Sequence, residues 1–140
     1  METINKDIFS INPKNLTKCI YKDLKTYARV YKVYDGDTVS IIFNYNNEFI
    51  KYSCRVNRID TPEIRTKNQV EKEHALIAKK YLSDMILEKI IIVKILGFDK
   101  YGRLLVELYD ADNGKNINDL MISGGFANEY YGKTKLDFKF

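Results

Sequence analysis

The sequence is poor in histidine and cysteine: its 140 residues include one histidine, His74, and two cysteines, Cys19 and Cys54. Only one residue could therefore serve as the histidine base that activates a serine or cysteine nucleophile. A closed zinc site would need all three residues plus a carboxylate, and their spacing matches no zinc-binding pattern. We interpret the cysteines as free thiols and His74 as an ordinary helix residue. Any chemistry should depend on carboxylates, arginines and, where a metal takes part, a hard ion.

The sequence also lacks a long apolar run and a recognisable leader. Its longest apolar stretch, around residues 90–93, falls far short of the roughly 20 residues of a membrane-spanning helix. The first ten residues show no basic region followed by an apolar segment, which a secretion signal requires. We therefore expect an intracellular protein with no membrane association, and the sequence indicates no obligate protein partner.

Charge of one sign is only mildly in excess. Lysine and arginine number 23 against 19 acidic residues, which gives a net charge of +4. This balance permits a polyanionic partner without requiring one. Tryptophan is absent, but 11 tyrosines and 7 phenylalanines are present, and these rings could stack on bases or simply fill a β-sheet core.

The pattern of apolar residues predicts one α+β domain over residues 26–140, preceded by an N-terminal arm at residues 1–25. Alternation and turn signals predict five strands, at residues 27–34, 38–43, 49–59, 89–96 and 104–109. A helix is expected at residues 69–87, with Ala75, Ala78, Leu82 and Met85 on one face, and a short helix at residues 117–123. This order is that of an OB-fold, a five-stranded Greek-key β-barrel that often binds nucleic acid.

Three carboxylates fall at predicted strand ends. Asp37 alternates with Val39 and Ile41, so its side chain should point toward the face that those residues bury. Asp60 and Glu63 flank the Thr-Pro pair that ends the third strand. The three carboxylates could converge on one hard cation such as Ca²⁺, which takes 6–8 oxygen ligands. The alternative is that Asp-Gly-Asp-Thr and Asp-Thr-Pro-Glu are ordinary turn sequences.

Two arginines favour a functional interpretation of these carboxylates. Arg55 lies in the third strand, and Arg103 follows the turn at residues 99–102. A guanidinium group offers a planar fork that matches two phosphate oxygens. The other arginines, at positions 29, 58 and 65, are interpreted as ordinary surface charges. An arginine pair beside a carboxylate cluster indicates phosphodiester chemistry.

Three segments carry a family resemblance. They are Tyr-Asp-Gly-Asp-Thr-Val at 34–39, Cys-Arg-Val at 54–56 continuing to Ile-Asp-Thr-Pro-Glu at 59–63, and Asp-Lys-Tyr-Gly-Arg at 99–103. Together, in this order and at this spacing, they resemble the signature stretches of the staphylococcal (thermo)nuclease family. The resemblance covers residues 26 to about 131.

The resemblance implies a role for each matching position. Asp37 and Asp60 match the calcium-ligating aspartates, Thr61 matches the residue whose main-chain carbonyl binds the metal, and Asp35 matches a nearby supporting carboxylate. Glu63 matches the general base, and Arg55 and Arg103 match the arginines that hold the scissile phosphate. The residues that match nucleotide-contacting positions are Lys100, Tyr101 and Tyr131.

The implied activity is calcium-dependent hydrolysis of DNA or RNA at the P–O5′ bond, which leaves 3′-phosphate ends. An alternative is a non-catalytic OB-type module that binds nucleic acid or a protein segment. A third interpretation is a protein-interaction domain whose acidic cluster is only a set of turns, which predicts no metal binding.

Overall fold

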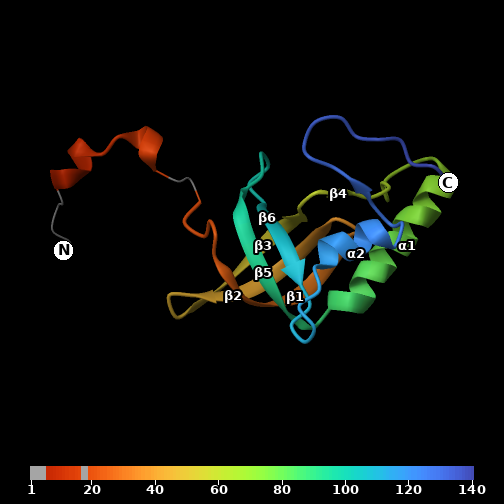
Figure 1. Ribbon diagram of the computed structural model, residues 1–140, viewed down its shortest axis with the longest axis horizontal. Coiled ribbons are helices and arrows are strands. Elements are labelled where there is room, and N and C mark those ends of the chain that lie inside the picture. Colours follow the sequence, from red (N-terminus) through yellow and green to blue (C-terminus); the bar gives the residue numbers. More distant parts are fainter. Residues whose placement is uncertain (1–5, 17–18) are drawn as a thin grey trace.

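A computed structural model describes residues 6–16 and 19–140 of the chain. Its centre is a five-stranded barrel closed in the order β1-β2-β3-β6-β5 (Figure 1). Neighbouring strands are antiparallel except β3 and β6, which pair in parallel. The strands are β1 Lys25–Asp35, β2 Thr38–Tyr45, β3 Glu48–Val56, β5 Ile90–Phe98 and β6 Leu104–Tyr109. The predicted OB-type barrel with two helices is confirmed.

Period-two alternation builds the core of this barrel. On β2, Val39, Ile41 and Phe43 are almost fully buried, whereas the residues between them are partly exposed. Burial of such side chains removes apolar surface from water, which stabilises the fold by roughly 25 cal/mol per Å² of that surface. The same alternation turns Asp37 inward at the start of β2, as the sequence predicts, and Asp37 is buried.

The turn between β1 and β2 lies against the segment that follows β4. A Cβ atom added to Gly36 would come within 2.7 Å of Thr61 Cγ2, so the close approach requires glycine. This contact brings the Asp-Gly-Asp-Thr turn beside Asp60 and Thr61, although 24 residues separate Asp37 from Thr61.

The predicted third strand, at residues 49–59, is wrong at its end. β3 stops at Val56, and a turn at Asn57 and Arg58 leads into a separate short strand, β4 Ile59–Asp60. Arg58 has a left-handed backbone, with φ of 65°, which breaks the strand. β4 pairs with β7 Asn128–Glu129, a two-stranded sheet that was not predicted.

The helices cover one side of the barrel (Figure 1). α1 Gln69–Ile86 is capped at its N-terminus by Asn68, whose side chain accepts a hydrogen bond from the N–H of Glu71. Its buried residues are Ala75, Ala78, Leu82 and Ile86. The last of these replaces the predicted Met85, which is only partly buried. α2 Ile117–Ser123 has the predicted bounds.

The N-terminal segment contains two short 3₁₀ turns, η1 Lys6–Ser10 and η2 Pro13–Asn15. Farther along, Cys19 and Tyr21 are buried in the core, and Cys19 and Cys54 form no disulfide bond with each other. The Tyr21 ring meets Phe43, Tyr45 and Tyr52 edge-on, with centroids 4.9–5.6 Å apart. Part of the segment assigned to the arm therefore packs on the barrel.

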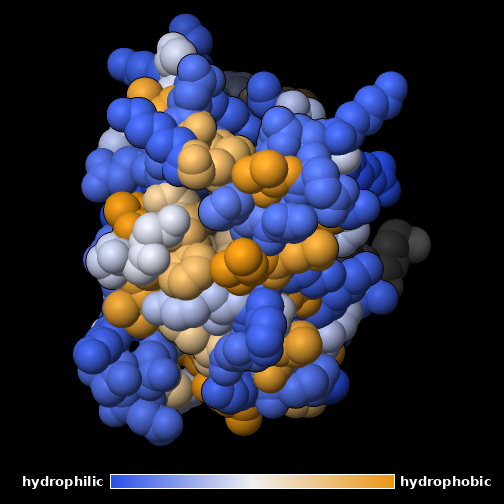
Figure 2. Space-filling view, turned by 90° about the vertical axis from the view of Figure 1, so that its right-hand side faces the viewer, coloured by the Kyte–Doolittle hydropathy of each residue, from blue (hydrophilic) through white to orange (hydrophobic). Residues whose placement is uncertain are grey.

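None of the helices in the described part of the chain is long and apolar enough to cross a membrane. Figure 2 shows apolar residues gathered across the middle of the side of the molecule that carries α1 and the C-terminal end, with hydrophilic residues around them. Exposed apolar residues of these two segments include Leu76, Ile77, Leu136 and Phe140.

Candidate active site

The barrel brings three of the sequence motifs to one end of the molecule. Thr38 at the start of β2 is the register partner of Arg55 on β3, and Arg55 in turn is the partner of Leu105 on β6. The parallel pairing of β3 and β6 therefore places Arg103, just before β6, beside the other two motifs. Neighbouring strands lie about 5 Å apart, so side chains at these positions can touch.

Asp37 lies at the centre of this group. Its Oδ2 accepts the main-chain N–H of Thr61 at 3.2 Å and lies 3.5 Å from Arg55 Nη2, while Oδ1 accepts the Thr38 hydroxyl at 3.2 Å. Burial alone would raise the pKa of Asp37. The Arg55 charge and the hydrogen bonds outweigh it, and the pKa is lowered below its ordinary value. Asp37 is therefore a fixed carboxylate anion.

Asp35 is the opposite case. Its Oδ1 accepts the N–H of Asp37 at 3.1 Å, which holds the two carboxyl groups close together. Burial, followed by the charge of Asp37, raises the pKa of Asp35 to about 7. Two neighbouring carboxyls thus titrate far apart, because the second cannot ionise readily beside the first.

Arg55 holds the end of β3 against β4. Its Nη1 donates to the carbonyl of Val56 at 2.9 Å and its Nη2 donates to that of Ile59 at 2.8 Å. With Asp37, these acceptors fix the plane of the guanidinium, whose side chain is 13% exposed. The turn at Asn57 and Arg58 makes both carbonyls available to one side chain.

Arg103 is positioned by the loop that precedes it. The Asp99 carboxylate accepts a hydrogen bond from Arg103 Nε at 2.7 Å. It also accepts hydrogen bonds from the main-chain N–H groups of Tyr101 and Arg103 at 2.8 and 2.9 Å. Arg103 Nη1 also donates to Thr38 Oγ1 at 3.5 Å, and that hydroxyl in turn donates to Asp37. A continuous chain of contacts therefore joins Arg103 to Asp37 and Arg55.

Asp60 and Glu63 complete the group from the β4 side. Asp60 is buried and forms an ion pair with Lys135, whose Nζ lies 3.1 Å from Oδ1. Glu63 is exposed, and its charge acts on the same ammonium group: burial works against the charged form, but Asp60 and then Glu63 raise the pKa of Lys135. Contacts therefore join Asp37, Arg55 and Arg103, whereas Asp60 pairs with Lys135 and Glu63 acts on that same lysine through its charge.

The predicted convergence of three carboxylates on one metal is not found: within residues 6–16 and 19–140, no group of three or more His, Cys, Asp or Glu side chains is placed to hold an ion. The donors that are present suit a hard cation. Asp37 and Asp60 are buried carboxylates. Thr61 is 2% exposed, and within the described residues its hydroxyl makes no hydrogen bond. A buried oxygen without a partner is costly unless something binds it. Two carboxylates and Thr61 therefore fit a calcium-type ion, with further oxygens from main chain and water.

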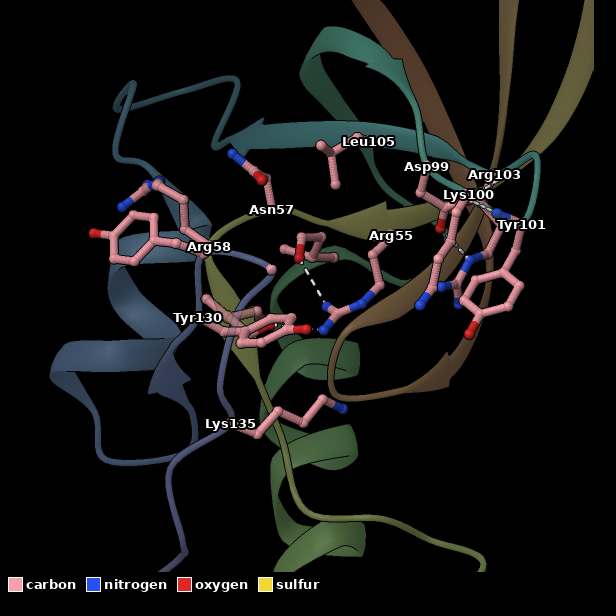
Figure 3. Close-up of a pocket in the computed structure, with 14 residues that line it drawn as sticks. Arg55, Asn57, Arg58, Asp99, Lys100, Tyr101, Arg103, Leu105, Tyr130 and Lys135 are labelled. Carbon is pink, nitrogen blue, oxygen red and sulfur yellow. Dashed lines mark hydrogen bonds and ion pairs between the residues drawn. The ribbon is translucent and has the colours of Figure 1, made fainter.

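A cavity of about 630 Å³ opens beside this group (Figure 3). Arg55 lies near its centre, with Lys100, Tyr101 and Arg103 on one side and Arg58 and Tyr130 on the other. Tyr101 and Tyr131, both predicted to contact nucleotide, line the cavity and are 71% and 68% exposed. Lys100 Nζ lies 5.2 Å from the centroid of the Tyr101 ring. The cavity is rich in cations and rings, as a nucleotide site requires.

The lining residues that escaped the sequence analysis include two on the C-terminal segment. Tyr130 and Lys135 lie on the C-terminal segment, which carries no periodic pattern or motif. A third residue, Arg58, was wrongly taken as an ordinary surface charge. Its guanidinium is 2.6 Å from Glu107 and 2.8 Å from Asp119, and this network holds the β3–β4 turn. One signal for Arg58 was its place in the alternation, because it falls on the phase that carries Cys54 and Val56.

Other residues match their simple interpretation. His74 is exposed on α1 and stacks on the ring of Phe140, with centroids 4.4 Å apart. Arg29 forms an exposed ion pair with Glu88. Neither residue lines the cavity.

Comparison with known proteins agrees with this geometry. A family model described as "Staphylococcal nuclease homologue" matches residues 53–139. An uncharacterized protein of Methanocaldococcus jannaschii is 28% identical in a match that covers 96% of this chain and 72% of that protein. Proteins called "uncharacterized endonuclease" match in Haemophilus influenzae, at 35% identity over 76% of this chain, and in Escherichia coli, at 28% identity over 72%. The chain spans 53% and 59% of the length of these two bacterial relatives.

Proposed function

This chain belongs to the staphylococcal nuclease family, and from that membership we propose that it is a calcium-dependent phosphodiesterase that cleaves DNA, RNA or both. The observation that carries the proposal is the chain of contacts from Arg103 through Thr38 and Asp37 to Arg55, at the edge of a basic cavity. Two arginines held by carboxylates around one cavity suit a phosphodiester, which needs its negative charge neutralised during displacement at phosphorus.

Asp37, Asp60 and Thr61 would hold the ion. A calcium ion bound there supplies Lewis-acid neutralisation of charge on the phosphoryl oxygens. Asp35 supports this arrangement because its carboxyl accepts the N–H of Asp37 and so fixes the backbone from which Asp37 projects.

Arg55 and Arg103 would bind the non-bridging oxygens of the scissile phosphate. Glu63, the exposed carboxylate on the same side, would take the proton of the attacking water, which typically contributes roughly 10²–10⁴-fold. Attack on phosphorus breaks the P–O5′ bond, and the products carry 3′-phosphate and 5′-hydroxyl ends. Lys100, Tyr101 and Tyr131 would bind the neighbouring nucleotide by charge and stacking.

The test is a cleavage assay on single-stranded DNA, duplex DNA and RNA, each with calcium or with a chelator. We expect degradation with calcium and none with the chelator, and product ends that are dephosphorylated by a 3′-phosphatase. Binding without cleavage in both conditions would instead support the OB-type binding module, and neither binding nor cleavage would support a protein-interaction domain.

A pair of matched variants assigns the base. Glu63→Gln should lower calcium-dependent cleavage by about 10²-fold or more, because an amide cannot accept the proton of water. Glu73→Gln makes the same change at an exposed position on α1 and should cleave like the unaltered protein. Near-normal cleavage by Glu63→Gln would remove that residue from its proposed role.

A further inference from the structure

The buried carboxylate of Asp60 is neutralised by a lysine from the end of the chain. Asp60 is 3% exposed, and its Oδ1 lies 3.1 Å from Lys135 Nζ. Within the described residues, this ion pair is the one that Asp60 makes. The Lys135 side chain is half exposed, so its ammonium reaches inward from a segment at the surface. Figure 3 shows it pointing from below the cavity toward Arg55.

The segment that carries Lys135 is fastened at several points. Asn128 Nδ2 donates to the carbonyl of Leu136 at 3.4 Å, and Lys135 Nζ lies 5.5 Å from the centroid of the Tyr130 ring. Farther on, Phe140 stacks on His74 of α1. These contacts are individually weak and exposed, so they hold the segment without locking it.

We propose that Lys135 is a built-in competitor for the metal, which neutralises Asp60 in the metal-free protein and must leave that carboxylate before a divalent cation can bind it. Residues 132–140 then act as an autoinhibitory strap across the site. The inference rests on the proposed function, because it takes Asp60 as a metal ligand.

Electrostatics supports displacement rather than joint occupancy. An ammonium group 3.1 Å from an oxygen occupies the position from which a cation would approach that oxygen, and two cations at such a distance repel each other. Arg55, whose charge lowers the pKa of Lys135, already adds positive charge on this side. A bound divalent ion would therefore drive the ammonium away. Lys135 also lines the cavity, so its displaced ammonium stays within reach of an anionic substrate there.

The consequence is a reduced apparent affinity for calcium. When only a fraction of molecules has Asp60 free, the apparent dissociation constant rises by the inverse of that fraction. An ion pair that leaves Asp60 free in about one molecule in ten weakens calcium binding about tenfold.

Isothermal titration calorimetry with calcium chloride tests this directly, without nucleic acid. Lys135→Met removes the ammonium and keeps an apolar stem, and it should bind calcium about tenfold more tightly than the unaltered protein. Lys133→Met makes the same change two residues away on an exposed lysine and should leave the affinity unchanged. Lys135→Arg should bind calcium more weakly than the unaltered protein, because a guanidinium can donate two hydrogen bonds to one carboxylate.

The outcomes separate the two proposals. Equal calcium affinity of Lys135→Met and the unaltered protein would overturn the strap while leaving the metal site intact. Calcium binding by none of the proteins would contradict the metal site itself, and the strap with it. A second measurement uses no metal: in chelator, Lys135→Met should melt at a lower temperature, because Asp60 loses its partner. This difference should narrow as calcium is added, and a constant difference would count against displacement.

Discussion

The guanidinium of Arg55 lies 3.5 Å from the carboxylate of Asp37, and both side chains are 13% exposed. The same guanidinium donates to the carbonyls of Val56 and Ile59. One side chain therefore joins the start of β2, the end of β3 and β4. An arginine proposed to bind phosphate also holds together the backbone that carries the proposed metal ligands.

Removing this guanidinium should destabilise the fold as well as the site. Arg55→Met leaves Asp37 buried without its cation, and loss of one member of a buried pair typically costs about 3–5 kcal/mol. Urea unfolding should show this loss. The double variant Arg55→Met with Asp37→Asn should recover part of it, because no charge is then left unpaired. Equal stabilities of the single and double variants would show that the two groups are not coupled.

Arg103 should behave differently, because its side chain is 29% exposed and because Asp99, its ion-pair partner, keeps the main-chain N–H groups of Tyr101 and Arg103 as donors when the guanidinium is removed. Arg103→Ala should lower calcium-dependent cleavage by about 10²–10³-fold, the usual effect of deleting a donor that stabilises developing charge. Its free energy of unfolding should change by only about 1 kcal/mol. Arg29→Ala, at an exposed ion pair, is the control for loss of a surface arginine. Unimpaired cleavage by Arg103→Ala would remove Arg103 from the site.

Asp35 gives the chain a pH dependence of stability. Its pKa is raised to about 7 in the folded protein, so the folded state holds a proton that the unfolded state releases near pH 4. Stability is therefore lost as pH rises from about 4 to about 7. Asp35→Asn keeps an acceptor for the Asp37 N–H and cannot ionise. It should be more stable than the unaltered protein above pH 7, by about 1–2 kcal/mol because partial exposure screens the repulsion.

Unfolding curves at several pH values check this. The advantage of Asp35→Asn should grow between pH 4 and pH 7 and then level off. An advantage that is the same at pH 4 and pH 8 would mean that ionisation of Asp35 is not its cause.

Asn118 should be among the most sensitive polar residues. It is fully buried on α2, accepts the N–H of Leu108, and donates to the carbonyls of Asn57 and Val106 and to Glu107. Asn118→Ala would leave these groups without their hydrogen-bond partner. We expect the free energy of unfolding, measured by denaturant titration, to fall by about 2–4 kcal/mol. Asn113→Ala, in an exposed turn, supplies the comparison. A loss below 1 kcal/mol at position 118, as at an ordinary surface site, would contradict the network.

Local sequence patterns were sufficient to predict the strands and helices whose apolar residues follow a regular spacing. β6 and α2 have the predicted bounds, and the phase of Val39 and Ile41 correctly turns Asp37 inward. The motifs also predicted that Arg55 and Arg103 act together, and both residues line the same cavity.

Contacts between residues that are distant in the sequence could not be predicted from local patterns. The β3–β4 turn depends on Arg58, Glu107 and Asp119, which are distant in sequence and meet only in the folded barrel. The ion pair between Asp60 and Lys135 also joins residues that are distant in sequence. Lys135 lies in a segment without a periodic pattern, so the sequence around it does not indicate its partner. The unpredicted sheet of β4 and β7 is too short for its alternation to stand out.

The parallel pairing of β3 with β6 has a consequence for the newly made chain. Arg55 belongs to the strands that emerge first from the ribosome, whereas Arg103 and β6 follow only after α1 and β5. Pairing between such distant strands comes late, because it must close a long loop. A nascent or half-folded molecule would therefore hold the two arginines apart, and the proposed phosphate site would form only when β3 and β6 pair.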